Sequence, residues 1–397
     1  MLLLGIVYSI FLQSMSLMAL VVLAFLDINR IDNSTNIRFS WKPILALREP
    51  NNYYHVLVIT LYFWIVLFSF WQVEDSSFLL ERLRIKVPFL LLPLAFLGLP
   101  RFQKSTFYKI LVFFISLMSV SVAAVLLNYV LHFEEVNLML KQGQSMATPC
   151  NHIRFSILLG LGVISGWYLI KEGYRSTGWE RNWIKFATVF LFVAIHILSV
   201  KTGILCLYGA LFVLVVRHIF TSRSWKMGAL ILAGLILVPV VAYKAVPSFN
   251  TKVHYTLYDL QMYYEGSGSA YGDSGRLVSL KVGADIFRSN PFIGVGAGNL
   301  NTAVNDYFRN YFPDYVPLMP HNQFLYVLAG SGILGLFLFL TALVLPLLRN
   351  RAYQNDFFLG FYAMFILSFM IEHTIENALG VGIFSSFLIF CLLSESD

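Results

Sequence analysis

The sequence predicts an all-α polytopic membrane protein, with 11–12 transmembrane helices and one large, partly helical loop on the outer side of the membrane. Of its 397 residues, 58% are hydrophobic and 12% are charged, whereas charged residues make up about a quarter of a typical soluble domain. The apolar residues gather in runs, and crossing about 30 Å of hydrocarbon takes about 20 helical residues. Within lipid these runs must be helices, because the backbone there can satisfy its polar groups only internally.

The expected helices follow from the apolar segments, which lie at 2–26, 55–72, 87–100, 106–131, 153–170, 184–200, 203–216, 227–246, 323–348, 357–374 and 378–394. The first run has no basic leader, so we expect a retained membrane segment rather than a cleaved signal peptide. It either crosses once, giving eleven helices, or forms a hairpin broken near Gln13-Ser14, giving twelve; its length and polar middle favour the hairpin. The segments 87–100 and 203–216 are short, which indicates a thinned bilayer or partial re-entry.

Lys and Arg residues set the expected orientation. More than half of the 28 lie in the short connections 27–54, 101–109, 171–185, 217–226 and 348–356, which are therefore predicted to be cytoplasmic. The segments 73–86, 132–152 and 247–320 then face outward, and the C-terminus lies inside. The net charge of +7 forms no basic patch with interleaved aromatic residues, so no nucleic-acid partner is predicted, and the surroundings are membrane lipid.

The chain divides into an N-terminal transmembrane bundle (1–246), a large outer loop (247–320) and C-terminal transmembrane helices (321–397). The loop contains a Gly/Ser-rich bend at 266–275, a helix-like run from Arg276 to Arg288 and a Pro-Gly turn region, NPFIGVGAGN (290–299). Functional residues concentrate on such loops. We therefore expect the chemistry of the protein to lie there.

Three cations are candidate anion ligands. Lys201 and Arg154 lie at the predicted outer membrane boundary, where the orientation rule requires no positive charge. Each is also compatible with a snorkelling side chain at a helix end. Arg276 follows Asp273 and Ser274, either of which could cap the helix; an anion there would meet a guanidinium and free backbone N–H groups. The alternative for Arg276 is an ordinary solvated side chain.

His321 and Asn322 lie where the large loop re-enters the membrane. An imidazole near its normal pKa is the usual general base for activating a hydroxyl group, although an interfacial histidine fits the position as well. The segment EHTIE (372–376) is not HExxH and has no third ligand in the sequence, and its place at the outer end makes it a possible supporting element. The outward loops contain no DxD-like acidic cluster. We therefore predict no metal and no cofactor.

Several motifs together resemble the O-antigen ligase and O-antigen polymerase superfamily. They are SGRLVSLKVGADIFRSNPFIGVGAGN (274–299), PHNQFLYVLAGSGILGLFLFL (320–340), HIRFSILL (152–159) and HILSVKTGILCLY (196–208). The last two resemble the versions common in Bacteroidetes-type members. The resemblance covers roughly residues 150–340, and the N-terminal third matches only in hydropathy and helix spacing.

This resemblance implies a glycosyltransferase at the outer face of the bacterial inner membrane, with the large loop in the periplasm. The donor would be a glycan on undecaprenyl pyrophosphate. The acceptor would be lipid A–core oligosaccharide in a ligase, or another lipid-linked glycan in a polymerase, and the ligase is favoured. The resemblance maps Arg276 and Lys201 onto contacts to the donor pyrophosphate and His321 onto the base.

Residues from separate segments complete the expected site. Arg154 would be a further cation for the pyrophosphate, with His152 and Asn322 in support. The position of Lys201 is usually an arginine in the family, and lysine lacks the planar fork that grips phosphate oxygens. We expect a metal-independent, inverting displacement. A transporter for lipid-linked glycans would need internal repeats and charges in mid-membrane, and a non-enzymatic scaffold would leave the outward cations and histidine unexplained.

Overall fold

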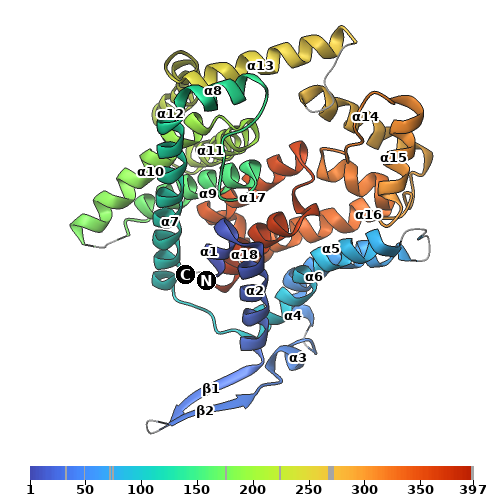
Figure 1. The fold of residues 1–397 in the computed structure, drawn as a ribbon. Helices are drawn as coiled ribbons and strands as arrows, with labels where there is room; N and C mark the ends of the chain where they lie inside the picture. Colours follow the sequence, from blue (N-terminus) through green and yellow to red (C-terminus); the bar gives the residue numbers. More distant parts are fainter. Residues whose placement is uncertain are drawn as a thin grey trace.

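The computed structural model describes the chain except for residues 32–33, 49, 71–72, 74–75, 175–176, 223–224, 267–271 and 395–397. Nearly all of its secondary structure is helical (Figure 1), which confirms the predicted fold class. Among the described residues, 6 helices are long and apolar enough to cross a membrane, and shorter apolar helices accompany them. The protein is therefore a multi-pass membrane protein.

The N-terminal run folds as two helices, α1 (Leu2–Tyr8) and α2 (Ile10–Ala24). The break lies at Ser9, not near Gln13-Ser14 as predicted. Ser9 is extended (φ −157°) and its hydroxyl accepts a hydrogen bond from Leu12 N at 3.2 Å. Gln13 stays helical because its side-chain amide donates to Ala378 O at 2.9 Å. Since seven residues of helix span only about 10 Å, α1 does not cross the membrane by itself.

The next segment contains a β-hairpin that the sequence reading missed. Strands β1 (Leu26–Ile31) and β2 (Ser34–Phe39) pair antiparallel and extend away from the helices, at the end of the molecule opposite α13 (Figure 1). The helices that follow are α3 (Lys42–Ala46), α4 (Pro50–Leu57), η1 (Val58–Thr60), α5 (Leu61–Leu67), α6 (Ser76–Gly98), α7 (Lys104–Leu131) and α8 (Phe133–Lys141).

Helix α6 is longer than its apolar segment, 87–100. It begins at Ser76, so the charged residues of segment 81–86, which were placed in an outer connection, lie within the helix. The predicted segment began too late because Lys86 looks like a loop residue, yet its side chain is 3% exposed and lies in an ion pair described below.

A second group of helices contains α9, whose side chains are mostly buried; α10 and α11 pack against α9, and α12 packs against α11. It comprises α9 (His152–Lys171), α10 (Gly178–Leu198), α11 (Lys201–Ser222) and α12 (Trp225–Ala245). Helix α11 has 22 residues, so the short 203–216 segment was also an underestimate. Ser199 adopts a left-handed conformation (φ 55°) that ends α10. The chain therefore reverses within a few residues and α11 starts at Lys201.

The large loop is folded. It forms α13 (Pro247–Tyr264), α14 (Asp273–Ser289) and α15 (Leu300–Tyr311), and residues 267–271 of the predicted Gly/Ser-rich bend lie outside the described part. Helices α14, α15 and α16 share a separate apolar core made of Val278, Val282, Ile286, Leu300, Val304, Phe308, Tyr326 and Ala329. Helix α13 contacts α8 and α12 and caps one end of the molecule (Figure 1).

The C-terminal part contains α16 (Gln323–Leu348), η3 (Arg349–Gln354), α17 (Asp356–Ile371), η4 (Thr374–Glu376) and α18 (Ala378–Leu393). The backbone of α16 departs from helical geometry at Gly332 (φ 63°, ψ −165°). There Ile333 N donates to Pro291 O at 2.9 Å, and a Cβ on Gly332 would meet the Phe292 carbonyl at 2.3 Å. The turn at 290–295 thus docks backbone to backbone on α16, and this approach requires glycine.

Candidate active site

A cavity of about 500 Å³ lies where the first turns of α9, α11 and α14 meet α13 and the connection before α9. Three cationic side chains line it: Lys201, Lys252 and Arg276. Asp273 and His152 also line the wall. The structure therefore brings two of the predicted pyrophosphate ligands, Lys201 and Arg276, to one cavity together with a lysine that the sequence reading did not single out.

Lys201 enters this cavity from the first residue of α11. Its ammonium group lies 2.5 Å from the Asp273 carboxylate and donates to the Thr256 hydroxyl at 3.0 Å. The side chain is nearly half exposed. Lys201 is thus not a snorkelling residue in lipid, and a carboxylate shares its charge in this state.

Arg276 lies in the first turn of α14, and a residue of another helix caps the N-terminus of α14. Neither Asp273 nor Ser274 is the cap that the sequence suggested; Asp259 of α13 accepts hydrogen bonds from both Asp273 N and the Ser274 hydroxyl. A Cβ on Gly272 would meet the Asp259 carboxylate at 1.7 Å. Glycine at this position therefore lets α13 hold the start of α14, which sets the direction of the Arg276 side chain.

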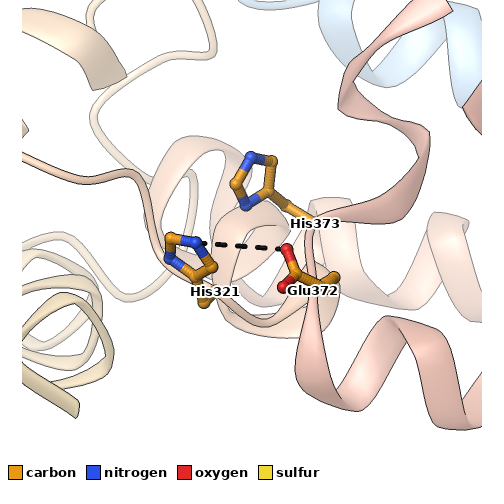
Figure 2. A group of neighbouring side chains, drawn as sticks. All are labelled: His321, Glu372 and His373. Atoms are coloured by element: carbon orange, nitrogen blue, oxygen red, sulfur yellow. Dashed lines mark ion pairs between the residues drawn. The ribbon is translucent and has the colours of Figure 1, made fainter. Parts of the chain in front are cut away.

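Glu372 connects Arg276 to His321. It follows α17, is almost fully buried, and one of its carboxylate oxygens lies 2.7 Å from Arg276 Nη2. The other oxygen faces His321 Nε2 across 4.0 Å (Figure 2). A single carboxylate thus joins the predicted base to a cation of the cavity.

His321 is held in one tautomer. Its Nδ1 lies 3.0 Å from Met319 O, and a carbonyl can only accept, so Nδ1 carries the proton and Nε2 keeps its lone pair. Ser279 fixes the backbone by accepting from His321 N at 3.2 Å. Burial lowers the pKa of His321 below its ordinary value, and Arg276 lowers it further, whereas Glu372 raises it. The imidazole is therefore neutral at pH 7, with a free acceptor directed toward Glu372.

His373 lies beside this pair (Figure 2), and its buried Nδ1 has no hydrogen-bond partner among the residues that the structure describes. Burial lowers the pKa of His373 to about 4. His321, Glu372 and His373 each offer one ligand atom, all within 4.8 Å of one another, so His321 supplies the third group that the EHTIE segment lacked in the sequence.

The charge balance around these three residues disfavours a divalent cation. Arg276 already pairs with Glu372, and Arg154 donates to the nearby Thr374 O at 3.2 Å. Two guanidinium groups therefore accompany one carboxylate in the described part of this cluster. Such a site suits an acceptor hydroxyl or an anion better than a metal ion.

The other predicted residues occupy supporting positions. Arg154 is 4% exposed and is not among the cavity-lining residues; it reaches the turn that follows α17 instead. Asn322 caps α16 by accepting from Leu325 N at 2.9 Å, and its amide donates to Met370 O at 2.9 Å. Asn322 thereby ties His321 to the end of α17. His152 lies on the cavity wall.

A buried ion pair supports the turn at 372–377. Lys86 of α6 lies 2.7 Å from the Glu376 carboxylate and also donates to Ile375 O. The Gln323 amide donates to the same carboxylate at 2.6 Å. Sequence reasoning missed Lys86 as a site element, and it gave the segment that contains Glu372 only a possible supporting role. The available signal was that ionisable residues next to apolar runs are costly and therefore functional candidates.

One comparison with known proteins finds a family model that matches part of the chain. Residues 186–340 match the family model described as O-Antigen ligase. The match contains Lys201, Lys252, Arg276 and His321, and it ends before Glu372. No curated protein sequence matches the chain. Residues 186–340 are thus similar to the O-antigen ligase family, as the motifs indicated.

Proposed function

With an O-antigen ligase-like domain as the premise, we propose that this protein transfers a glycan from undecaprenyl pyrophosphate to lipid A–core oligosaccharide. The reaction takes place at the periplasmic face of the bacterial inner membrane. The observation that carries the proposal is the link through Glu372, which joins a free imidazole nitrogen of His321 to Arg276 on the wall of a cationic cavity. A nucleophile-activating group and a leaving-group site thus lie next to each other.

The cavity is the donor side of the proposed site. Breaking the bond between the sugar and pyrophosphate leaves negative charge on a phosphate oxygen, and fixed cations stabilise that charge most strongly in a partly dehydrated site. Arg276 and Lys201 supply two such cations. Their present partners, Glu372 and Asp273, mark where anionic oxygens fit.

His321 lies on the acceptor side of the proposed site. The acceptor oxygen attacks the anomeric carbon while its proton passes to His321 Nε2. The bond between the anomeric carbon and the pyrophosphate oxygen breaks, and the electron pair leaves with the pyrophosphate. Direct displacement of this kind inverts the anomeric configuration. Glu372 stabilises the imidazolium as it forms, because its free oxygen faces Nε2. No metal ion takes part in this proposed step.

Complementation of two deletion strains tests the proposal, with lipopolysaccharide gels as the readout. One strain lacks its O-antigen ligase and the other lacks its O-antigen polymerase; both receive the wild-type gene or His321→Ala. We expect the wild type to restore polymer on lipid A–core in the first strain only, and the variant to restore nothing at equal membrane abundance.

The other outcomes contradict the proposal in distinct ways. Restored ladder length in the second strain alone would identify a polymerase of lipid-linked repeats. Failure in both strains, with wild-type protein present in the membrane, would leave a transporter or a scaffold as the explanation. Full activity of His321→Ala would remove the assigned base.

A further inference from the structure

The three cations of the cavity differ in how their charge is balanced. Asp273 pairs with Lys201 at 2.5 Å, and Glu372 pairs with Arg276 at 2.7 Å. Within the described part of the chain, Lys252 forms no ion pair; its ammonium group donates to two backbone carbonyls, Gly143 O at 2.9 Å and Gln144 O. Lys252 is therefore the cation whose charge the cavity leaves uncompensated.

Lys252 is held in place by the loop opposite. Gly143 has φ +84°, and a Cβ there would meet the Tyr255 ring at 2.4 Å, so a glycine lets the loop carbonyls approach α13. The Lys252 ammonium also lies 5.8 Å from the centre of the Tyr255 ring. One turn along α13, Thr256 accepts from Lys201. The two lysines thus reach the same cavity from α13 and α11.

The surroundings make an unbalanced charge costly. Lys252 is half-buried, and burial lowers the pKa of its ammonium group to about 8. That value already includes the Lys201 charge, which also lowers the pKa, and the Asp273 carboxylate, which raises it. His152 and Tyr255 are the other titratable groups on the cavity wall near it. An anion in the cavity would remove this cost, because it would supply the missing negative charge.

We propose that Lys252 is a phosphate-binding residue of the donor cavity. Its ammonium group contacts the phosphate, whereas part of the charge of Lys201 is already balanced by Asp273. The ligand class is a pyrophosphate ester. This inference rests on the proposed function for the identity of the donor. It also accounts for the lysine at position 201, since a second ammonium group supplies charge where the family usually has a guanidinium.

Binding of inorganic pyrophosphate to the full-length protein in detergent, measured by calorimetry, tests the inference without a transfer assay. Lys252→Met should weaken binding about tenfold or more at pH 7, as expected for loss of a hydrogen bond to a charged group. Lys252→Arg should bind nearly as the wild type does. Lys281→Met is the matched control, because Lys281 lies over the Phe312 ring and outside the cavity.

The pH dependence gives a second readout that a structural role would not change. Wild-type affinity should fall from pH 7 to pH 9 as Lys252 loses its proton, and Lys252→Arg should lose less, because a guanidinium stays charged. Wild-type affinity in Lys252→Met, with unchanged thermal stability, would overturn the inference. So would a wild-type protein that binds no pyrophosphate. If complementation fails but Lys252→Met still weakens binding, the anion site stands and the transferase assignment falls.

Discussion

At the scale of single residues, the protonation state of His321 would set the pH range of the proposed reaction. Burial and Arg276 lower its pKa below the ordinary 6.5, so the neutral form that accepts a proton persists well into mildly acidic solution. We expect the transfer rate to be flat near pH 7 and to fall only as the pH drops through this lowered pKa. Initial rates between pH 5 and 8 at saturating donor measure the position of the acid limb.

A variant of Glu372 tests whether the acid limb of the pH–rate profile comes from His321. Glu372 raises the pKa of His321, so Glu372→Gln should move the acid limb to lower pH and also reduce the maximal rate, because the imidazolium loses its counter-charge. An acid limb above pH 6.5 in the wild type, or an unmoved limb in the variant, would contradict this account of His321.

Arg276 is the second residue-level prediction. Arg276→Lys keeps the charge but loses the planar fork that can contact Glu372 and a phosphate oxygen together. We expect the transfer rate to fall about a hundredfold, the lower range for loss of one preorganised charge-stabilising donor. Kinetics with varied donor concentration measure the loss. Arg288→Lys is the control, because Arg288 is 74% exposed and pairs with its neighbour Asp285 on the same helix; equal losses in both variants would contradict a specific role.

At the scale of elements, the ion pair between α6 and η4 supports the turn at 372–377. Lys86 and Glu376 are both almost fully buried. Removing one partner of such a pair costs about 3–5 kcal/mol, since it leaves an unpaired buried charge. Lys86→Met should therefore lower the unfolding temperature of the purified protein and its activity. Lys86→Met combined with Glu376→Gln should recover part of the stability, and an additive loss in the double variant would argue against a direct pair.

These elements also show what the sequence could reveal. Long apolar runs with few or no charges, such as 106–131, with one lysine near its start, and 323–348, gave helices close to α7 and α16, because hydropathy identifies such segments. The predicted start of the helix at residue 87 was too late, because Lys86 is neutralised by Glu376, which lies 290 residues away. A one-dimensional pattern cannot contain that partner.

The candidate site residues also divide into those that local motifs identify and those that only tertiary contacts identify. His321, Arg276 and Lys201 were identifiable because their local motifs place unusual charges at the outer boundary. Glu372 was not assigned a role, since nothing in EHTIE indicates that Asn322 ties the end of α17 to His321. The role of Lys252 depends on which carboxylates its neighbours contact, and only the folded structure contains that information.

At the scale of the whole molecule, the site draws on every part of the chain. The large loop supplies Arg276 and Lys252, the N-terminal bundle supplies Lys201, and the C-terminal helices supply Glu372. The division at 246 and 320 stays a sequence prediction. The contacts between these parts, however, imply that the loop alone would lack both the carboxylate that faces His321 and one cation of the cavity.

The orientation in the membrane is the last prediction, and the proposed function depends on it. The β1–β2 hairpin and α13 lie at opposite ends of the molecule (Figure 1), and the distribution of Lys and Arg predicts that α13 is periplasmic. In a variant with Cys150, Cys206 and Cys391 replaced, a single cysteine is introduced at Tyr264 or at Ile37, whose side chains are 82% and 59% exposed.

A charged maleimide that does not cross the inner membrane then reports the side of each cysteine in spheroplasts. We expect Tyr264→Cys to react in intact spheroplasts and Ile37→Cys to react only after lysis, in protein that still complements. The reverse pattern would place the cavity and His321 on the cytoplasmic face. A periplasmic transferase would then be untenable, because the donor pyrophosphate and the acceptor hydroxyl must reach the cavity from the same side.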